Sequence, residues 1–240
     1  APARKDWPDA WLPANRPATA KLEGELESKP PSIVLGHADA GFAFDNELGA
    51  HEVALEGFAI DRAPVTWGRY LPFVEAGGYD DESQWTAEGW AWRQKSSNGL
   101  PRFLQRPDAE AAWQRACFGH WVDLDLAQPA VNLSLHEAQA WCRWAGRVLP
   151  TEAQWALASQ ASGDEFEWGQ VWEWTASDFA PFPGFEPHPY RDYSQPWFDG
   201  RPVLRGASFA TAPGLRHRSY RNYFTADRTD IFAGFRSCAA

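Results

Sequence analysis

The chain has no methionine and only three cysteines among its 240 residues. The cysteines, Cys117, Cys142 and Cys238, are odd in number and widely spaced. This pattern fits neither a disulfide framework nor a Cys-x-x-Cys metal site. We interpret them as buried or idle thiols of a protein in a reducing compartment, and we expect a cytoplasmic location.

The chain also lacks an excess of basic residues and a long apolar run. It has 22 Lys and Arg against 32 Asp and Glu, a formal net charge of −10. Nucleic acids and anionic membranes bind basic surfaces, so we expect neither as a partner. No apolar run approaches the roughly 18 residues that span a bilayer, and the N-terminus has no apolar stretch typical of a signal peptide.

The six histidines lack the spacing of a metal site. None forms a His-x-x-x-His or His-x-His pattern, so local sequence gives no facial triad. His136 and Glu137 are neighbours on a predicted helix, where one step puts them on different faces. We therefore expect no metal ligand in this chain.

Aromatic residues are unusually frequent, with 15 Trp, 15 Phe and 6 Tyr. They lie among 19 Gly and 19 Pro, which interrupt helices and strands. Together with 44% hydrophobic residues, this composition predicts a sizeable core in a coil-rich domain whose loops are packed by aromatic rings.

The first 31 residues contain six prolines and little periodicity, which indicates an extended arm or inter-domain linker before a domain at 32–240. A strand is expected near 32–35, and one or two strands in 51–66. Thr66 can cap a helix that ends at Gly77, shortened or kinked by Pro72. From 78 to 128 no period holds, and we expect mostly coil.

Two helices carry strong start signals. Ser134 and Glu137 form an S-x-x-E capping box ahead of an apolar stripe that ends at Gly146. Thr151 and Gln154 form a T-x-x-Q box for the next helix. Short strands are expected in VWEWTAS, PVLRGAS and FAGFRSC, at 171–177, 202–208 and 232–238.

Five motifs follow one another in the last 95 residues, and several spaced motifs in order are more specific than one. They are GRVLPTEAQWALA (146–158), VWEWTASDF (171–179), VLRGASF (203–209), YRNYF (220–224) and FAGFR (232–236). They resemble the formylglycine-generating-enzyme fold, an α+β, C-type-lectin-like fold with sparse regular structure. The chain looks most similar to the C-terminal half of the ergothioneine-type sulfoxide synthases and the related selenoneine synthases, over roughly residue 32 to the C-terminus.

This resemblance implies a reaction. In the family, a mononuclear non-haem iron(II) centre uses O2 to form a C–S or C–Se bond on the imidazole of hercynine, which is Nα-trimethylhistidine. The iron ligands lie in a separate N-terminal, DinB-like helical domain that this chain does not contain. The implied partners are therefore hercynine, a thiol or selenium donor, and that domain.

The resemblance also implies substrate-binding residues in YRNYF. Asn222 would hydrogen-bond the hercynine carboxylate or imidazole, while Tyr223 and Phe224 would face the quaternary ammonium, which aromatic rings hold by cation–π attraction. Without the resemblance, we would interpret the Tyr223 and Phe224 rings as aromatic side chains that only pack in the core. Some relatives have an acidic residue at the position of Phe224, which leaves the identity of the donor open.

The Pro-rich loop from Asp178 to Phe198 is long and irregular, as functional loops often are. The resemblance implies that a tyrosine here donates a proton or hydrogen atom in the reaction, with Tyr190 and Tyr193 as candidates. His188 is a further candidate for substrate binding. The alternative is that these side chains only pin the loop.

Two other functions stay open. The formylglycine-generating oxidases hold copper with a cysteine pair, but here the matching region has Ser219 and no cysteine. A catalytically silent binding module of the lectin-like type is the other alternative. We interpret the charged residues inside the aromatic motifs as scaffold: Glu173, Arg205, Arg221, Arg228 and Arg236.

Overall fold

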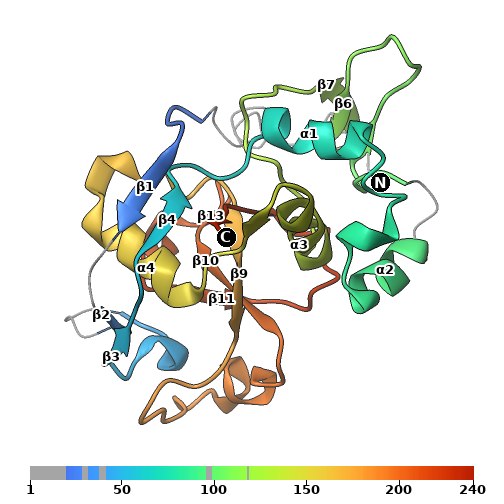
Figure 1. Cartoon of the computed structure of the whole chain (residues 1–240). Coiled ribbons are helices and arrows are strands. Elements are labelled where there is room, and N and C mark those ends of the chain that lie inside the picture. The colour runs from blue at the N-terminus through green and yellow to red at the C-terminus, as the bar shows by residue number, and fades with distance from the viewer. Residues whose placement is uncertain (1–19, 29–31, 38–41, 96–98, 118) are drawn as a thin grey trace.

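The computed structural model describes residues 20–28, 32–37, 42–95, 99–117 and 119–240 (Figure 1). Two four-stranded sheets form its centre, in the orders β1-β4-β13-β8 and β11-β10-β9-β12. Their strands are β1 (Glu25–Ser28), β4 (Phe58–Asp61), β8 (Arg147–Val148), β9 (Trp172–Asp178), β10 (Pro202–Gly206), β11 (Arg221–Tyr223), β12 (Ala233–Phe235) and β13 (Cys238–Ala239). The mixture of short helices and strands confirms the expected α+β fold.

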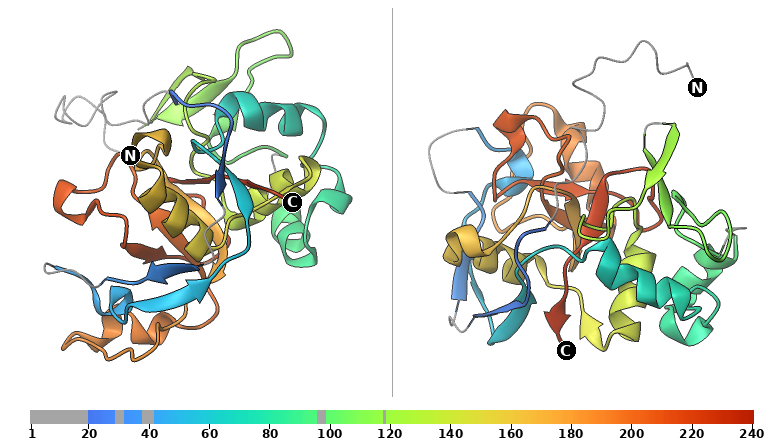
Figure 2. Two further views of the ribbon diagram at one scale, coloured as in Figure 1. Left: turned by 60° about the vertical axis from the view of Figure 1, so that its left-hand side comes forward. Right: turned by 90° about the horizontal axis from the view of Figure 1, so that it is seen from above.

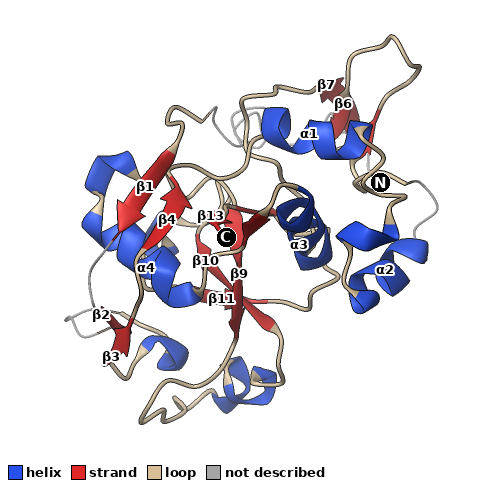
Figure 3. Cartoon of the chain, in the orientation of Figure 1, coloured by secondary structure: helices blue, strands red, loops and turns tan. Residues whose placement is uncertain are grey.

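Two small antiparallel sheets lie at the periphery. One is the pair β2 (Ser32–Leu35) and β3 (His51–Ala54), and the other consists of β5 (Leu104–Gln105), β6 (Gln114–Cys117) and β7 (His120–Asp123). The helices α1 (Trp67–Glu75), α2 (Ala87–Gln94) and α3 (Leu135–Trp144) lie on one side of the β9–β12 sheet, and α4 (Glu152–Ala161) lies on the other (Figure 3). Among the described residues, no helix is long and apolar enough to cross a bilayer.

The two capping boxes predicted from sequence are confirmed. The Ser134 hydroxyl accepts the Glu137 N–H at 3.2 Å, and a Glu137 carboxylate oxygen accepts the Ser134 N–H at 2.7 Å. Thr151 and Gln154 make the same reciprocal pair at the start of α4. Each box satisfies two N–H groups that a helix start leaves without intrahelical partners.

The prediction of a helix after Thr66 is confirmed, although its cap differs. The helix α1 contains Pro72 and ends at Glu75, shortly before Gly77, whose φ of +77° lies in the left-handed region. The Thr66 side chain makes no capping hydrogen bond.

The expectation of mostly coil from 78 to 128 holds for more than half of the described residues there, but the region contains more regular structure than the missing period suggests. This region contains α2, which Thr86 caps by accepting the Gly89 N–H at 3.0 Å, and the β5-β6-β7 sheet. In α2 only Gly89 is fully buried, so the helix has no apolar stripe from which a period could be read.

The expected boundary at residue 31 also differs from the structure. Strand β1 pairs along its whole length with β4, and Leu26 is buried against α4. The Ala20 N–H donates to the Ala127 carbonyl at 2.9 Å. Residues 20–28 therefore pack as part of the domain. The rest of the expected arm, residues 1–19 and 29–31, lies outside the described residues.

The main core lies between α1, α3 and one face of the central sheet. Trp174, Leu204 and Phe235 project from three neighbouring strands into it, because residues paired across a sheet share a face. On the opposite face, the fully buried Glu173 accepts from Arg236 at 2.9 Å and from Trp155 at 2.9 Å. Figure 2 shows α4 lying close to this face.

Candidate substrate-binding site

Strand β11 carries the predicted substrate-binding residues and forms one edge of the central sheet. Its register with β10 pairs Asn222 with Leu204, on the main-core face, and Tyr223 with Val203, on the opposite face. The Tyr223 N–H donates a hydrogen bond of 2.9 Å to the Asn222 side-chain oxygen. The Asn222 side-chain oxygen thus satisfies a backbone donor of the edge strand, and the side-chain NH2 group can donate to another acceptor.

Arg221 fixes β11 in place. Its guanidinium donates to both oxygens of Glu152 at 2.7 and 3.0 Å, and to the carbonyls of Asn46 and Ala180 at 2.8 and 3.0 Å. The same group lies 3.8 Å from the ring centroid of Phe182. Such a buried, bidentate pair orients the strand strongly, and it confirms the interpretation of Arg221 as scaffold.

The other four residues interpreted as scaffold divide into two groups. Arg205, in β10, donates a hydrogen bond of 3.1 Å to the Glu152 carboxylate. Glu173 and Arg236 form an ion pair in which both residues are fully buried. Arg228 differs, since it pairs with Asp230 at the surface. The first three are buried structural charges, whereas Arg228 forms an exposed ion pair.

Tyr223 and Tyr193 lie together. The Tyr223 ring stacks on Phe179 with centroids 4.0 Å apart, and its hydroxyl donates to the Tyr193 carbonyl. The two tyrosine rings meet edge to face at 6.3 Å. The loop from Asp178 to Phe198 therefore contacts β11, as Figure 1 shows below the central sheet.

The Tyr193 side chain is held by two further aromatics. Its ring stacks on Phe44 at 4.3 Å, and its hydroxyl lies 3.3 Å from that of Tyr220. Burial, followed by the hydrogen bond with Tyr220, raises the pKa of Tyr193, and burial raises the pKa of Tyr223 to about 12. Both hydroxyls therefore keep their proton at neutral pH.

His188 and Tyr190 are not brought to this cluster. The Tyr190 side chain is 68% exposed, and His188 contributes its backbone N–H to Asp45 at 3.2 Å. Among the described residues, neither side chain makes a hydrogen bond or ring contact with Tyr193 or β11. Of the two tyrosines, Tyr193 is therefore the one that lies beside β11.

Phe224 is separated from Tyr223. Its ring packs against the main core and lies under the Arg228 guanidinium at 4.9 Å, whereas the Tyr223 ring contacts Phe179 and Tyr193. The two adjacent rings therefore do not form one continuous aromatic wall. A ligand that contacts both Asn222 and Tyr223 must lie along the edge of β11, where both faces of the strand can be reached.

A partly buried polar cluster next to Tyr220 was not foreseen from sequence. The Ser219 hydroxyl lies 2.9 Å from His217 Nδ1, 3.4 Å from His37 Nδ1 and 3.4 Å from the Glu47 carboxylate. Burial raises the pKa of Glu47 to about 7, and burial lowers that of His217, helped by the charges of His37 and Arg205. These residues come from distant parts of the chain, so no local pattern marks them.

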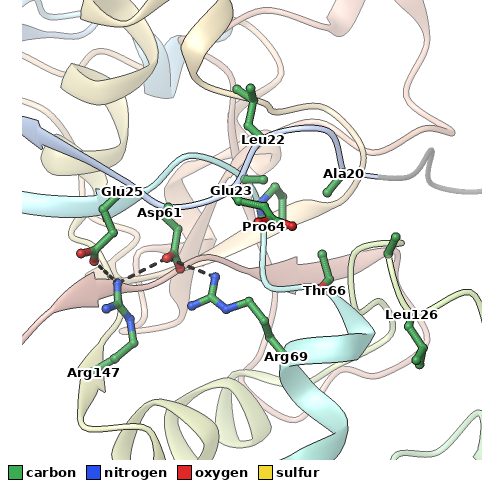
Figure 4. Close-up of a pocket in the computed structure, with 13 residues that line it drawn as sticks. Ala20, Leu22, Glu23, Glu25, Asp61, Pro64, Thr66, Arg69, Leu126 and Arg147 are labelled. Carbon is green, nitrogen blue, oxygen red and sulfur yellow. Dashed lines mark hydrogen bonds and ion pairs between the residues drawn. The ribbon is translucent and has the colours of Figure 1, made fainter.

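A separate hollow of about 670 Å³ lies between β1, β4 and α1 (Figure 4). Its buried Asp61 contacts Arg69 at 3.1 Å and Arg147 at 3.4 Å, and accepts the Ser237 N–H at 2.9 Å. These charges satisfy one another, which is the pattern of a structural network. None of the residues predicted to bind substrate lines it.

The cysteines of the chain lie away from the candidate site. Cys142 is buried in α3 and Cys238 in β13, while Cys117 ends β6, and none of these three described residues forms a disulfide. Burial raises the pKa of Cys142, and it raises that of Cys238 to about 12. Both buried thiols are therefore protonated and poor nucleophiles or metal ligands at neutral pH.

The architecture defines an α+β domain of low regular structure. A solved structure, Treponema denticola variable protein 1, shares this fold with a TM-score of 0.56 and 16% identity, over 90% of this chain and 94% of that one. The chain belongs to the family described as sulfatase-modifying factor enzyme 1-like domain, whose profile matches residues 20–170 and 167–240.

Two curated relatives are hercynine oxygenases. That of Mycolicibacterium smegmatis is 33% identical over 94% of this chain and 63% of the relative. That of Mycolicibacterium thermoresistibile is 34% identical over 94% of this chain and 60% of the relative. The chain thus spans about 60% of the length of these relatives.

Proposed function

We propose that this chain is the substrate-binding domain of an enzyme of the hercynine oxygenase type. The reaction would join sulfur or selenium to the imidazole carbon of hercynine with O2 as oxidant, in ergothioneine or selenoneine biosynthesis. The similarity to two hercynine oxygenases supports the reaction class. The observation that carries the assignment to this site is the contact between Tyr193 of the loop and Tyr223 of the edge strand β11.

Each residue has a distinct role in this proposal. The Asn222 NH2 group donates to the hercynine carboxylate or imidazole. The trimethylammonium group, which has no N–H, lies against an aromatic ring, for which Tyr223 is best placed at the edge and Phe224 contributes only at the end of the strand. His188 and Tyr190 are the weaker members of the predicted set, because both side chains project into solvent.

The Tyr193 hydroxyl is the proposed proton donor. It is protonated at neutral pH and is oriented by the Phe44 stack and by Tyr220. A fixed hydroxyl at the edge of the substrate site can deliver a proton without first being reoriented. The loop around it also excludes water from that side of the substrate.

The described residues do not fit an iron site. They hold no group of three His, Cys, Asp or Glu side chains placed to bind a metal ion. The proposal therefore takes the Fe(II) ligands from an N-terminal DinB-like domain of the same protein, and Fe(II) would supply the O2 activation there. We propose a cytoplasmic location on the grounds of cysteine content.

The donor is a thiol or a selenium compound. The apolar Phe224 ring cannot bind an amino group as a carboxylate does, so donor recognition here needs other groups. Sulfur and selenium donors of the same shape differ little in size, so the proposal covers both classes of donor.

The natural protein that carries this chain provides the test. Purified with Fe(II), it is incubated with hercynine, O2 and a series of thiol or selenium donors, and products are identified by mass spectrometry. We expect hercynine-dependent O2 consumption and a C–S or C–Se product. Binding of hercynine without O2 consumption under any donor would favour a silent binding module, and conversion of a peptide cysteine to formylglycine would favour the oxidase.

A further inference from the structure

Two arginines that follow the 3-10 helix η9 (Pro213–Leu215) lie beside one tryptophan. The guanidinium carbons of Arg216 and Arg218 are 5.9 and 5.6 Å from the ring centroid of Trp168. Both arginines are exposed, whereas Trp168 is half-buried and meets the buried Trp155 ring edge to face. The tryptophan is thus anchored in the core next to α4, and both cations lie at the surface beside it.

Neither arginine has a carboxylate partner, although the chain carries a formal net charge of −10. Within the part of the chain that the structure describes, neither the Arg216 nor the Arg218 guanidinium forms an ion pair or donates a hydrogen bond. Two like charges held beside one ring repel each other, and each keeps N–H donors that face solvent. An anion bound between them removes this repulsion and accepts hydrogen bonds from both.

The carboxylates nearest to Trp168 in the sequence are engaged elsewhere. Glu165 lies 3.4 Å from the Arg62 guanidinium. Both Glu167 oxygens accept the Lys21 N–H, at 2.8 and 3.1 Å. Neither carboxylate forms an ion pair with the two arginines, so the positive charge beside Trp168 has no partner within the domain.

The two arginines are held in place by their surroundings. The buried Arg205 donates to the backbone carbonyls of Arg218 and Ser219, which fixes the chain at this point. The Arg216 guanidinium lies over Gly169, where a Cβ atom would be only 2.4 Å from its Nη2. A glycine here therefore makes room for the Arg216 side chain. Groups that are already in position lose little conformational freedom when they bind a ligand.

We propose that Arg216 and Arg218 bind the phosphate group of a small molecule, either inorganic phosphate or a phosphate monoester. Each planar guanidinium offers paired N–H donors that match phosphate oxygens. A phosphate monoester carries about −1.5 to −2 charges at pH 7, which balances two cations better than one carboxylate does. In an ester, the carbon atoms next to the phosphate pack on the exposed part of the Trp168 ring. The site uses no residue proposed to bind hercynine and does not depend on the proposed reaction.

The test uses the natural protein, titrated with inorganic phosphate and with glycerol 3-phosphate at constant ionic strength. Calorimetry gives the affinity, NMR follows the Nε–H groups of Arg216 and Arg218, and acetate is the monoanionic control. We expect saturable binding of either phosphate, shifts of both Nε–H resonances, and little response to acetate. Affinity should rise from pH 5 to 7, because the second phosphate pKa is about 6. Tighter binding of glycerol 3-phosphate would identify an ester as the ligand, and no saturable binding of either would overturn the proposal.

Neutral variants locate the site. Arg216→Gln and Arg218→Gln are compared with Arg106→Gln, a matched control whose guanidinium also lies over a tryptophan, Trp113 at 5.6 Å, but has Glu75 3.9 Å away. Each of the first two should weaken phosphate binding by roughly 3- to 10-fold, as expected for a charged hydrogen bond at the surface. Arg106→Gln should leave it unchanged, and all three should unfold at the parent temperature. Equal phosphate affinity in all three variants would overturn the proposal.

Discussion

The Tyr223 hydroxyl donates a hydrogen bond to the backbone carbonyl of Tyr193, 30 residues earlier in the chain. This contact joins the edge strand β11 to the loop that carries the proposed proton donor. Since the Tyr193 ring also stacks on Phe44, the loop is held both by its backbone and by its side chain. The positions of the strand proposed to bind substrate and of the proposed proton donor are therefore coupled.

Tyr223→Phe removes this link and keeps the ring on Phe179. We expect a loss of about 1 kcal/mol in the free energy of unfolding, the usual value of one such hydrogen bond. Turnover should fall more than hercynine affinity, because the loop moves while the ring stays. Denaturant unfolding and steady-state kinetics of the natural protein check both effects, and a variant with unchanged kcat would argue against the coupling.

Tyr193→Phe tests the proton donor directly. General acid catalysis contributes about 10²- to 10⁴-fold, so we expect turnover to fall by about that factor while hercynine still binds. Tyr190→Phe is the matched control, because that side chain is 68% exposed. If Tyr190→Phe stops turnover and Tyr193→Phe does not, the assignment of the donor is wrong.

Arg221→Met should strongly destabilise the domain. It leaves Glu152 buried without its two-point partner, a change that typically costs about 3 to 5 kcal/mol. Arg228→Met, which breaks the exposed pair with Asp230, should cost at most about 1 kcal/mol. Equal midpoints of denaturant unfolding for the two variants would show that Arg221 is not a structural anchor.

Glu47 predicts a pH dependence of stability. Its pKa is about 7 in the folded protein against 4.5 in a model peptide, mainly because of burial. The folded state then binds more protons than the unfolded state between these values, so this group's contribution to stability falls as pH rises from about 4.5 to 7.

Glu47→Gln should remove that dependence. The stability of the variant relative to the parent should increase across this range by up to about 3 kcal/mol, from about 1.4 kcal/mol per pKa unit. His217 titrates nearby in the opposite direction, so the difference between parent and variant is the quantity to measure. A constant difference from pH 5 to 8 would contradict a raised pKa.

Local signals explain what the sequence could predict. The capping boxes at Ser134 and Thr151 need only neighbours within four residues, and β9, β10 and β12 overlap the short motifs in which strands were expected. The helix α2 was not predicted because few of its residues are buried, and β1 was not predicted because its partner residues in β4 are at least 30 positions away.

The candidate site was only partly accessible to sequence reasoning for the same physical reason. The motif around Asn222 marked the segment for substrate binding but did not predict strand β11, and which rings share a face depends on its pairing with β10. The cluster of His37, Glu47 and Ser219 joins positions more than 170 residues apart. Only the fold brings those groups together.

Hercynine affinity of the natural protein, measured by calorimetry alongside histidine, tests the central claim most directly. Tyr223→Ala should weaken hercynine binding by ~0.5 to 2 kcal/mol, the range for a cation on one ring, and histidine binding much less. Asn222→Ala should cost ~1 to 3 kcal/mol through an unpaired polar group on the ligand. If both variants bind hercynine as tightly as the parent while losing thermal stability, these residues are core and the substrate binds elsewhere.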